Sequence, residues 1–138
     1  MSFNILIVDD SAAMRSIINK TLQMSGLPLS EVHQAKNGAE ALEILSENWV
    51  DLALVDINMP VMDGETLINR VRENPDTEDL AIIVVSTESS ETRIDALRQK
   101  GVEFIHKPFA PEILRETVSR LTGVDYGTST IQSSDLDF

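Results

Sequence analysis

Polar side chains that could do chemistry follow four of five apolar runs, at the point where each run ends. They are Asp9 and Asp10 after the first run, Asp56 after the third, Ser86 and Thr87 after the fourth, and Lys107 after the fifth. If the fold brings these ends together, three carboxylates repel each other strongly unless a cation joins them. Carboxylate oxygens are hard ligands, and neither His nor Cys accompanies them. The predicted cation is therefore Mg²⁺.

A divalent metal, a lysine and a hydroxyl together could hold the three oxygens of a phosphoryl group. Lys107 offers a compact positive charge, and Ser86 or Thr87 offers a hydrogen-bond donor. One carboxylate then remains as the nucleophile that takes the phosphoryl group. The resulting acyl phosphate is labile, which suits a signal that must decay. The residue types thus predict phosphoryl transfer to a carboxylate.

Five short β-branched or aliphatic runs predict strands that could position these residues. The runs are Ile5–Val8, Val32–Ala35, Leu52–Val55, Ile82–Val85 and Phe104–Ile105. The middle runs are apolar on consecutive residues, as expected of parallel strands that helices cover on both faces. The second run is the least apolar, which favours an edge position.

Amphipathic segments between these runs predict five helices. Their apolar faces carry Met14, Ile17, Ile18 and Leu22 after the N-cap Ser11; Ala41, Leu42 and Leu45; Leu67, Ile68 and Val71; Ile94 and Leu97; and Ile113, Leu114, Val118 and Leu121 after Pro111. Alternating strands and helices predict a doubly wound α/β domain with a five-stranded parallel sheet. Ligands of such sheets bind at the carboxyl ends of the strands, so the polar residues should share one site.

Composition limits the classes of function. The chain has 138 residues, no Cys and a formal net charge of -12, which argues against nucleic-acid binding and against binding to anionic membranes. The longest apolar stretch, Leu80–Val85, is far shorter than the ~20 residues that a membrane-spanning helix needs, so we expect no membrane insertion. No basic segment precedes the first apolar run, as a signal peptide would require. We expect a cytoplasmic protein.

The last residues depart from this pattern. The segment "VDYGTSTIQSSDLDF" holds five Ser or Thr residues and three Asp residues. We expect a domain over residues 1–123 followed by a flexible acidic tail over residues 124–138. The alternative is that "SDLDF" docks on a partner or on the domain itself. Trp49 is expected to pack in the turn before the third strand. His33 and His106 are expected to be structural or surface residues without a metal site.

Four motifs taken together resemble a known family. "ILIVDDS", "ALVDINMPVMDG", "VVSTES" and "FIHKPF" occur in the order and spacing of the receiver domain of two-component response regulators. The resemblance covers roughly residues 3–122, and the length is similar to that of single-domain, chemotaxis-type (CheY-like) members. It implies a flavodoxin-like fold with the strand order 2-1-3-4-5.

The resemblance implies a role for each acid and for the lysine. Asp56 is expected to be the phosphoacceptor. Asp10, Asp56 and the backbone carbonyl of Asn58 are expected to bind Mg²⁺, with Asp9 acting through a metal-bound water. Lys107 is expected to pair with the phosphoryl group.

The resemblance also implies a switch. Ser86 is expected to swing toward the phosphoryl group, and Phe104 takes the place of the aromatic residue that turns inward when the hydroxyl moves. The Lys107–Pro108 bond resembles the cis peptide of the family. The chain departs from the family in carrying Ser86 where Thr is commoner. It is also one residue shorter between Gly101 and Lys107, which predicts a tighter loop.

The function implied is a phosphorylation-dependent switch and not an enzyme. A histidine kinase donates the phosphoryl group, and a protein partner, such as the flagellar motor in chemotaxis, reads the change. A stand-alone phosphorelay shuttle is an alternative. A Mg²⁺-dependent phosphohydrolase is a weaker alternative, because we expect no spare chain for a cap domain at this length and Asn58 cannot act as an acid or base.

Overall fold

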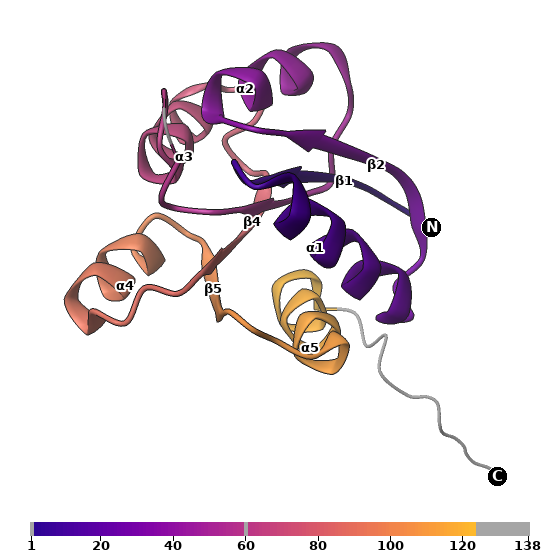
Figure 1. Cartoon of the computed structure of the whole chain (residues 1–138). Helices are drawn as coiled ribbons and strands as arrows, with labels where there is room; N and C mark the ends of the chain where they lie inside the picture. Colours follow the sequence, from indigo (N-terminus) through magenta and orange to yellow (C-terminus); the bar gives the residue numbers. More distant parts are fainter. Residues whose placement is uncertain (1, 60, 124–138) are drawn as a thin grey trace, which may run out of the picture.

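A single parallel sheet forms the centre of the computed structural model, which describes residues 2–59 and 61–123. Its strands are β1 (Phe3–Val8), β2 (Leu29–Ala35), β3 (Leu52–Val55), β4 (Ala81–Ser86) and β5 (Glu103–His106). They pair in the order β2-β1-β3-β4-β5, every pair parallel. The expected doubly wound, flavodoxin-like topology is confirmed, with β2 at an edge (Figure 1). The tail expected over residues 124–138 lies outside the described residues.

Within residues 2–59 and 61–123, four helices connect the strands and a fifth follows β5. They are α1 (Ala12–Met24), α2 (Gly38–Glu47), α3 (Gly64–Glu73), α4 (Glu91–Arg98) and α5 (Pro111–Thr122). The first four helices begin after a residue whose side chain caps the helix by accepting a backbone N–H, namely Ser11, Asn37, Asp63 and Ser90. Within the described residues, no helix is long and apolar enough to cross a membrane.

The sheet buries both of its faces. Helices α1 and α5 cover one face and α2, α3 and α4 cover the other (Figure 1). Successive residues of β1 therefore enter different cores: Leu6 packs on the side of α2–α4, and Ile5 and Ile7 pack on the side of α1 and α5. All three side chains are fully buried, and each contributes roughly 1.5–3 kcal/mol by leaving water. This explains why the strands are apolar on consecutive residues.

Several local predictions were wrong. Strand β2 begins at Leu29, three residues before the predicted start at Val32, because its first residues pair with the start of β1. These residues include polar side chains, which an edge strand tolerates, so a search for apolar runs missed them. Ile17 and Ile113 were placed on buried helix faces but are 55% and 45% exposed. Trp49 does not pack in its turn; its side chain is 73% exposed.

Gly64 brings α3 close to the end of β3. Its backbone N–H donates to the carbonyl of Ile57 at 2.9 Å. A Cβ atom at this position would overlap the carbonyl oxygen of Asp56. Glycine is therefore required for the chain to turn back onto the residue that follows β3.

Candidate functional site

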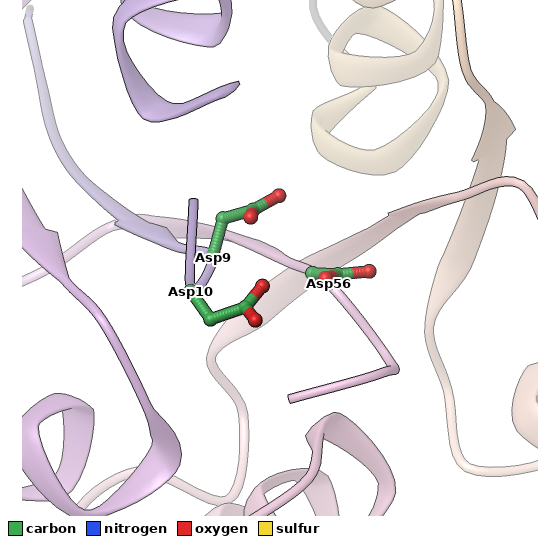
Figure 2. Close-up of side chains that lie close together, drawn as sticks. All are labelled: Asp9, Asp10 and Asp56. Atoms are coloured by element: carbon green, nitrogen blue, oxygen red, sulfur yellow. The ribbon is translucent and has the colours of Figure 1, made fainter. Parts of the chain in front are cut away.

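Two strand ends place three carboxylates side by side. The hydrogen bonds of the sheet continue one residue beyond the strands, since Asp9 N–H donates to the Ala35 carbonyl and Asp56 N–H to the Val8 carbonyl. Carboxylate oxygens of Asp9, Asp10 and Asp56 all lie within 4.8 Å of one another (Figure 2). The fold thus brings together the acids that the sequence placed at two separate strand ends.

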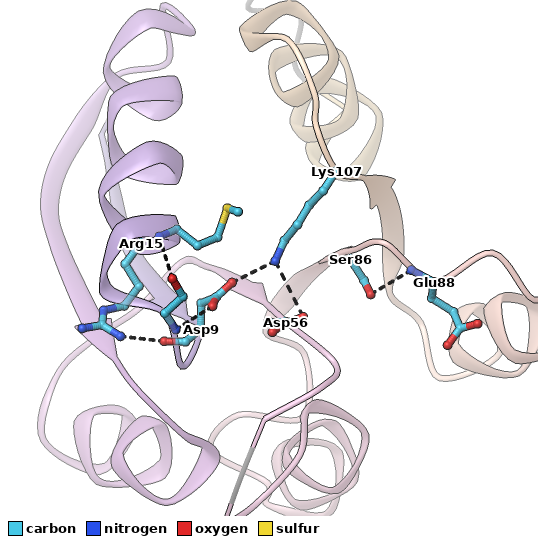
Figure 3. Close-up of polar contacts among 8 residues, drawn as sticks. Asp9, Arg15, Asp56, Ser86, Glu88 and Lys107 are labelled. Carbon is cyan, nitrogen blue, oxygen red and sulfur yellow. Dashed lines mark hydrogen bonds and ion pairs between the residues drawn. The ribbon is translucent and has the colours of Figure 1, made fainter.

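Lys107 reaches across this cluster from the end of β5. Its Nζ lies 3.0 Å from Oδ2 of Asp9 and 3.8 Å from Oδ1 of Asp56 (Figure 3). Asp9 is only 2% exposed, and its Oδ1 also accepts the backbone N–H of Ser11 at 2.9 Å. Arg15 donates to the Asp9 carbonyl at 2.7 Å, which fixes the start of α1 against the site. The sequence did not predict this hydrogen bond of Arg15.

The pKa of the Asp56 carboxyl is raised above its ordinary value. Burial is the largest cause, and the charge of Asp9 adds to it; the charge of Lys107 and the backbone N–H groups of Asn58 and Ile57 act in the opposite direction. Ionised Asp56 is therefore held at a cost in free energy. A cation among these oxygens would reduce that cost, and a purely carboxylate and carbonyl donor set fits Mg²⁺.

The hydroxyl at the end of β4 is buried beside this cluster. Ser86 is 1% exposed and its Oγ accepts the backbone N–H of Glu88 at 3.1 Å, whereas Thr87 is exposed. Glu88 in turn pairs with Arg93 at 2.8 Å, a contact that sequence spacing did not indicate. Ser86 is thus the hydroxyl built into the sheet.

The other predicted site residues differ in their surroundings. Asn58 is exposed, and its backbone faces Asp56. Phe104 is 8% exposed, packs in the core beneath α4, and contacts the ring of His106 edge-on with centroids 4.9 Å apart. The Lys107–Pro108 bond is cis, as the resemblance implied. Among the described residues, neither histidine joins a group of potential metal ligands.

An apolar groove borders the acidic cluster on the side of α1. It encloses about 330 Å³ and is lined by Met14, Ile17, Thr21, Thr87, Lys107, Pro108 and Phe109. The exposure of Ile17, which contradicted the helix prediction, therefore belongs to this groove. Lys107 lines this groove and also pairs with Asp9 and Asp56, so the groove adjoins the acidic cluster.

The profile of the response regulator receiver domain family matches residues 5–119. The chain belongs to this family. A CheY homolog of Campylobacter jejuni is 38% identical to this receiver domain over 125 residues, which cover 89% of this chain and 95% of the relative. The solved structure of the chemotaxis response regulator CheY4 of Vibrio cholerae has a TM-score of 0.76 at 33% identity, with 88% and 99% of the two chains covered.

Receiver domains also occur within longer proteins. Over 118 residues the chain is 36% identical to the sensor histidine kinase TmoS of Ectopseudomonas mendocina, and the match covers 85% of this chain but 12% of that protein. The likeness to CheY-type proteins spans nearly their whole length. Both kinds of relative agree with a signalling domain of two-component systems.

Proposed function

We propose that this receiver domain is a phosphorylation-dependent signalling switch that accepts a phosphoryl group from a histidine kinase on Asp56. The observation that carries the proposal is the contact set around Asp56: two neighbouring carboxylates within 4.8 Å and the Lys107 ammonium 3.8 Å from Oδ1. A carboxylate crowded by like charges and faced by one lysine is suited to a metal-assisted nucleophile. A structural acid would instead be surrounded by donors.

In the proposed transfer, a carboxylate oxygen of Asp56 forms a bond to phosphorus. The phosphorus–nitrogen bond of a kinase phosphohistidine breaks, and the imidazole leaves with the electron pair of that bond. Asp10, Asp56 and the carbonyl of Asn58 would hold Mg²⁺, with Asp9 acting through water. Bound Mg²⁺ supplies positive charge that offsets the repulsion between the carboxylates and the incoming phosphoryl oxygens.

The residues of the chain around Asp56 have separate tasks. The Lys107 ammonium, already between Asp9 and Asp56, pairs with the new phosphoryl oxygens. Ser86 leaves the backbone N–H of Glu88 and donates to the phosphoryl group. Phe104, whose ring is buried in the core beneath α4, is the aromatic residue that we expect to respond to this movement. The change biases the face formed by α4, β5 and α5, which a protein partner reads.

The groove beside Lys107 supports a protein as the phosphodonor. A phosphohistidine can reach Asp56 only if its carrier docks beside the acidic cluster. Met14, Ile17 and Phe109 supply apolar surface there. The likeness to CheY homologues favours a cytoplasmic chemotaxis pathway, with the flagellar motor as the output partner.

A phosphorelay shuttle is the second candidate, favoured by the match to a receiver-containing sensor kinase. It would use the same Asp56 chemistry and pass the group to a histidine on another protein. A phosphohydrolase would instead release phosphate continuously, and Asn58 supplies no acid or base for that turnover.

The experiment is to incubate the full chain with Mg²⁺ and acetyl phosphate, and to measure intact mass and released phosphate together. The proposal predicts one added phosphoryl group per chain, which requires Mg²⁺ and accumulates before phosphate is released. Lys107→Met is expected to retain the fold and to accumulate much less adduct. Steady phosphate release without an adduct would favour the hydrolase, and no adduct from any donor would overturn the proposal.

A further inference from the structure

A second groove lies at the amino ends of β3 and β4, whereas Asp56 follows the carboxyl end of β3. It encloses about 560 Å³ between the turn after α2, which carries Trp49 and Asp51, and the loop after α3, from Pro75 to Leu80. Asp51 directly precedes β3 and Leu80 directly precedes β4. The groove therefore opens where these strands begin, and the length of β3 separates it from Asp56.

The indole ring of Trp49 is held at the mouth of this groove. Its Nε1 donates to Oδ1 of Asp51 at 2.9 Å, and Oδ2 of Asp51 accepts the backbone N–H of Asn4 at 2.8 Å. The ring is thus oriented by hydrogen bonds while its side chain stays 73% exposed. A fixed, exposed tryptophan offers a large contact area without a cost for ordering it, which is typical of binding surfaces.

The opposite wall is equally well ordered. Nη1 of Arg72 donates to the carbonyls of Glu78 and Leu80 at 2.9 and 2.8 Å, and its Nε donates to the carbonyl of Lys100. The hydroxyl of Thr77 donates to the Val71 carbonyl at 2.9 Å. Both walls are therefore preorganised, so a ligand would not have to order them.

The charge on this groove is negative. Its lining includes Asp51, Asp76 and Asp79 and no Lys, Arg or His. In the described part of the chain, neither Asp76 nor Asp79 forms an ion pair within 4.0 Å. Asp79 acts on Arg72 through its charge, but the guanidinium donors of Arg72 are directed to backbone carbonyls.

We propose that this groove docks a basic segment of a partner protein, with an arginine stacked on Trp49 and paired with Asp76 or Asp79. A guanidinium is planar, stacks on aromatic faces and pairs with carboxylates, so it matches a tryptophan flanked by exposed acids. This goes beyond the switch function. Because the groove is remote from Asp56, docking is independent of phosphorylation.

Trp49 is the only tryptophan, so its emission reports directly on the groove. The probe is the amidated peptide Gly-Arg-Gly-Arg-Gly, titrated into the full chain, with Gly-Lys-Gly-Lys-Gly as a comparison. We expect saturable emission changes, tighter with arginine than with lysine. Asp76→Asn/Asp79→Asn is expected to weaken binding about fivefold or more. Asp56→Asn should leave it unchanged.

The matched control is Glu112→Gln/Glu116→Gln, which removes two exposed charges from α5, away from the groove. This variant must bind like the wild type. Equal weakening in both double variants would mean that only net charge attracts the peptide, and would overturn the proposal. So would an unchanged emission, or emission that varies with protein concentration alone, which would identify a second copy of the chain as the occupant. Trp49→Ala, followed by calorimetry, should abolish binding without unfolding the domain.

Discussion

Strand β3 has an aspartate at each end, and the two differ in every neighbour. Asp51, before the strand, accepts the Asn4 N–H on one oxygen and the Trp49 Nε1–H on the other, at 2.8 and 2.9 Å. Asp56, after the strand, has Asp9 and Asp10 within 4.8 Å, and Lys107 is 3.8 Å from its Oδ1. Burial and Asp9 raise the pKa of Asp56.

This difference shows that the neighbours of an aspartate decide whether its carboxylate stabilises the fold or is available for chemistry. Neutral donors satisfy both oxygens of Asp51, so its carboxylate stabilises the turn and the orientation of Trp49. Burial is the main factor that destabilises the ionised carboxylate of Asp56, and the charge of Asp9 adds to it, so this carboxylate is available to bind a cation or a phosphoryl group.

The largest effect on stability is expected from the loss of Arg72, which holds the loops at the amino ends of β4 and β5. Arg72→Met removes donors from four backbone carbonyls of the α3–β4 loop and the α4–β5 turn. We expect the free energy of unfolding to fall by about 3 kcal/mol, measured by urea denaturation. Arg70→Met, an exposed arginine on the same helix, should change it by less than about 0.5 kcal/mol. Equal effects of both would contradict this role of Arg72.

Replacing the two aspartates that flank β3 by asparagine is expected to change the stability of the fold in opposite directions. The raised pKa means that folded Asp56 binds a proton more tightly than the unfolded chain does. Its ionisation therefore lowers stability as the pH rises above the ordinary value of 3.8. Asp56→Asn should raise the melting temperature by a few °C at neutral pH, and the gain should vanish below pH 3.8.

Asp51→Asn is the counterpart of this test. Asparagine has one acceptor oxygen where two donors must be satisfied, so the free energy of unfolding should fall by about 1 kcal/mol. Thermal melts of both variants across pH give the comparison. If both substitutions stabilised the protein, Asp51 would not be the structural acid described above.

A smaller effect is expected from the loop after β3. Val61 has φ of 69° and is 83% exposed, a left-handed conformation that β-branched residues adopt at a cost. Val61→Asn should stabilise the fold by about 0.5–1 kcal/mol in urea denaturation, because asparagine accepts this conformation more readily. Val61→Ile keeps the branched Cβ and should bring no gain.

The smallest effect is expected on the emission of Trp49 when Asp56, at the other end of β3, is phosphorylated. Mg²⁺ and acetyl phosphate should leave its emission unchanged within a few per cent, since the ring lies before β3 and Asp56 lies after it. A large emission change on phosphorylation would show that the two ends are coupled. The independence of the two sites would then be wrong.

The sequence was informative where chemistry follows regular structure. Consecutive apolar residues in the runs that form β3 and β4 predicted burial on both faces, and strand ends predicted that Asp9, Asp56 and Lys107 would meet. The strand order came from the motif resemblance and is confirmed. The roles assigned to the site residues stay predictions.

What was missed depends on neighbours that periodicity does not encode. A helix pattern gave the apolar stripe of α1 but not its width, so Ile17 was placed inside although only Ile18 and Leu22 are buried. Trp49 was expected to pack, but its turn lies at the rim of a groove and its ring is oriented through Asp51.

Phosphorylation in the presence of Mg²⁺ distinguishes the two aspartates that flank β3 most directly. Wild type, Asp51→Asn and Asp56→Asn are incubated with Mg²⁺ and acetyl phosphate, and their intact masses are measured. One added phosphoryl group on the wild type and on Asp51→Asn, and none on Asp56→Asn, is the predicted result. An adduct that persists in Asp56→Asn would contradict the assignment of Asp56 as the acceptor.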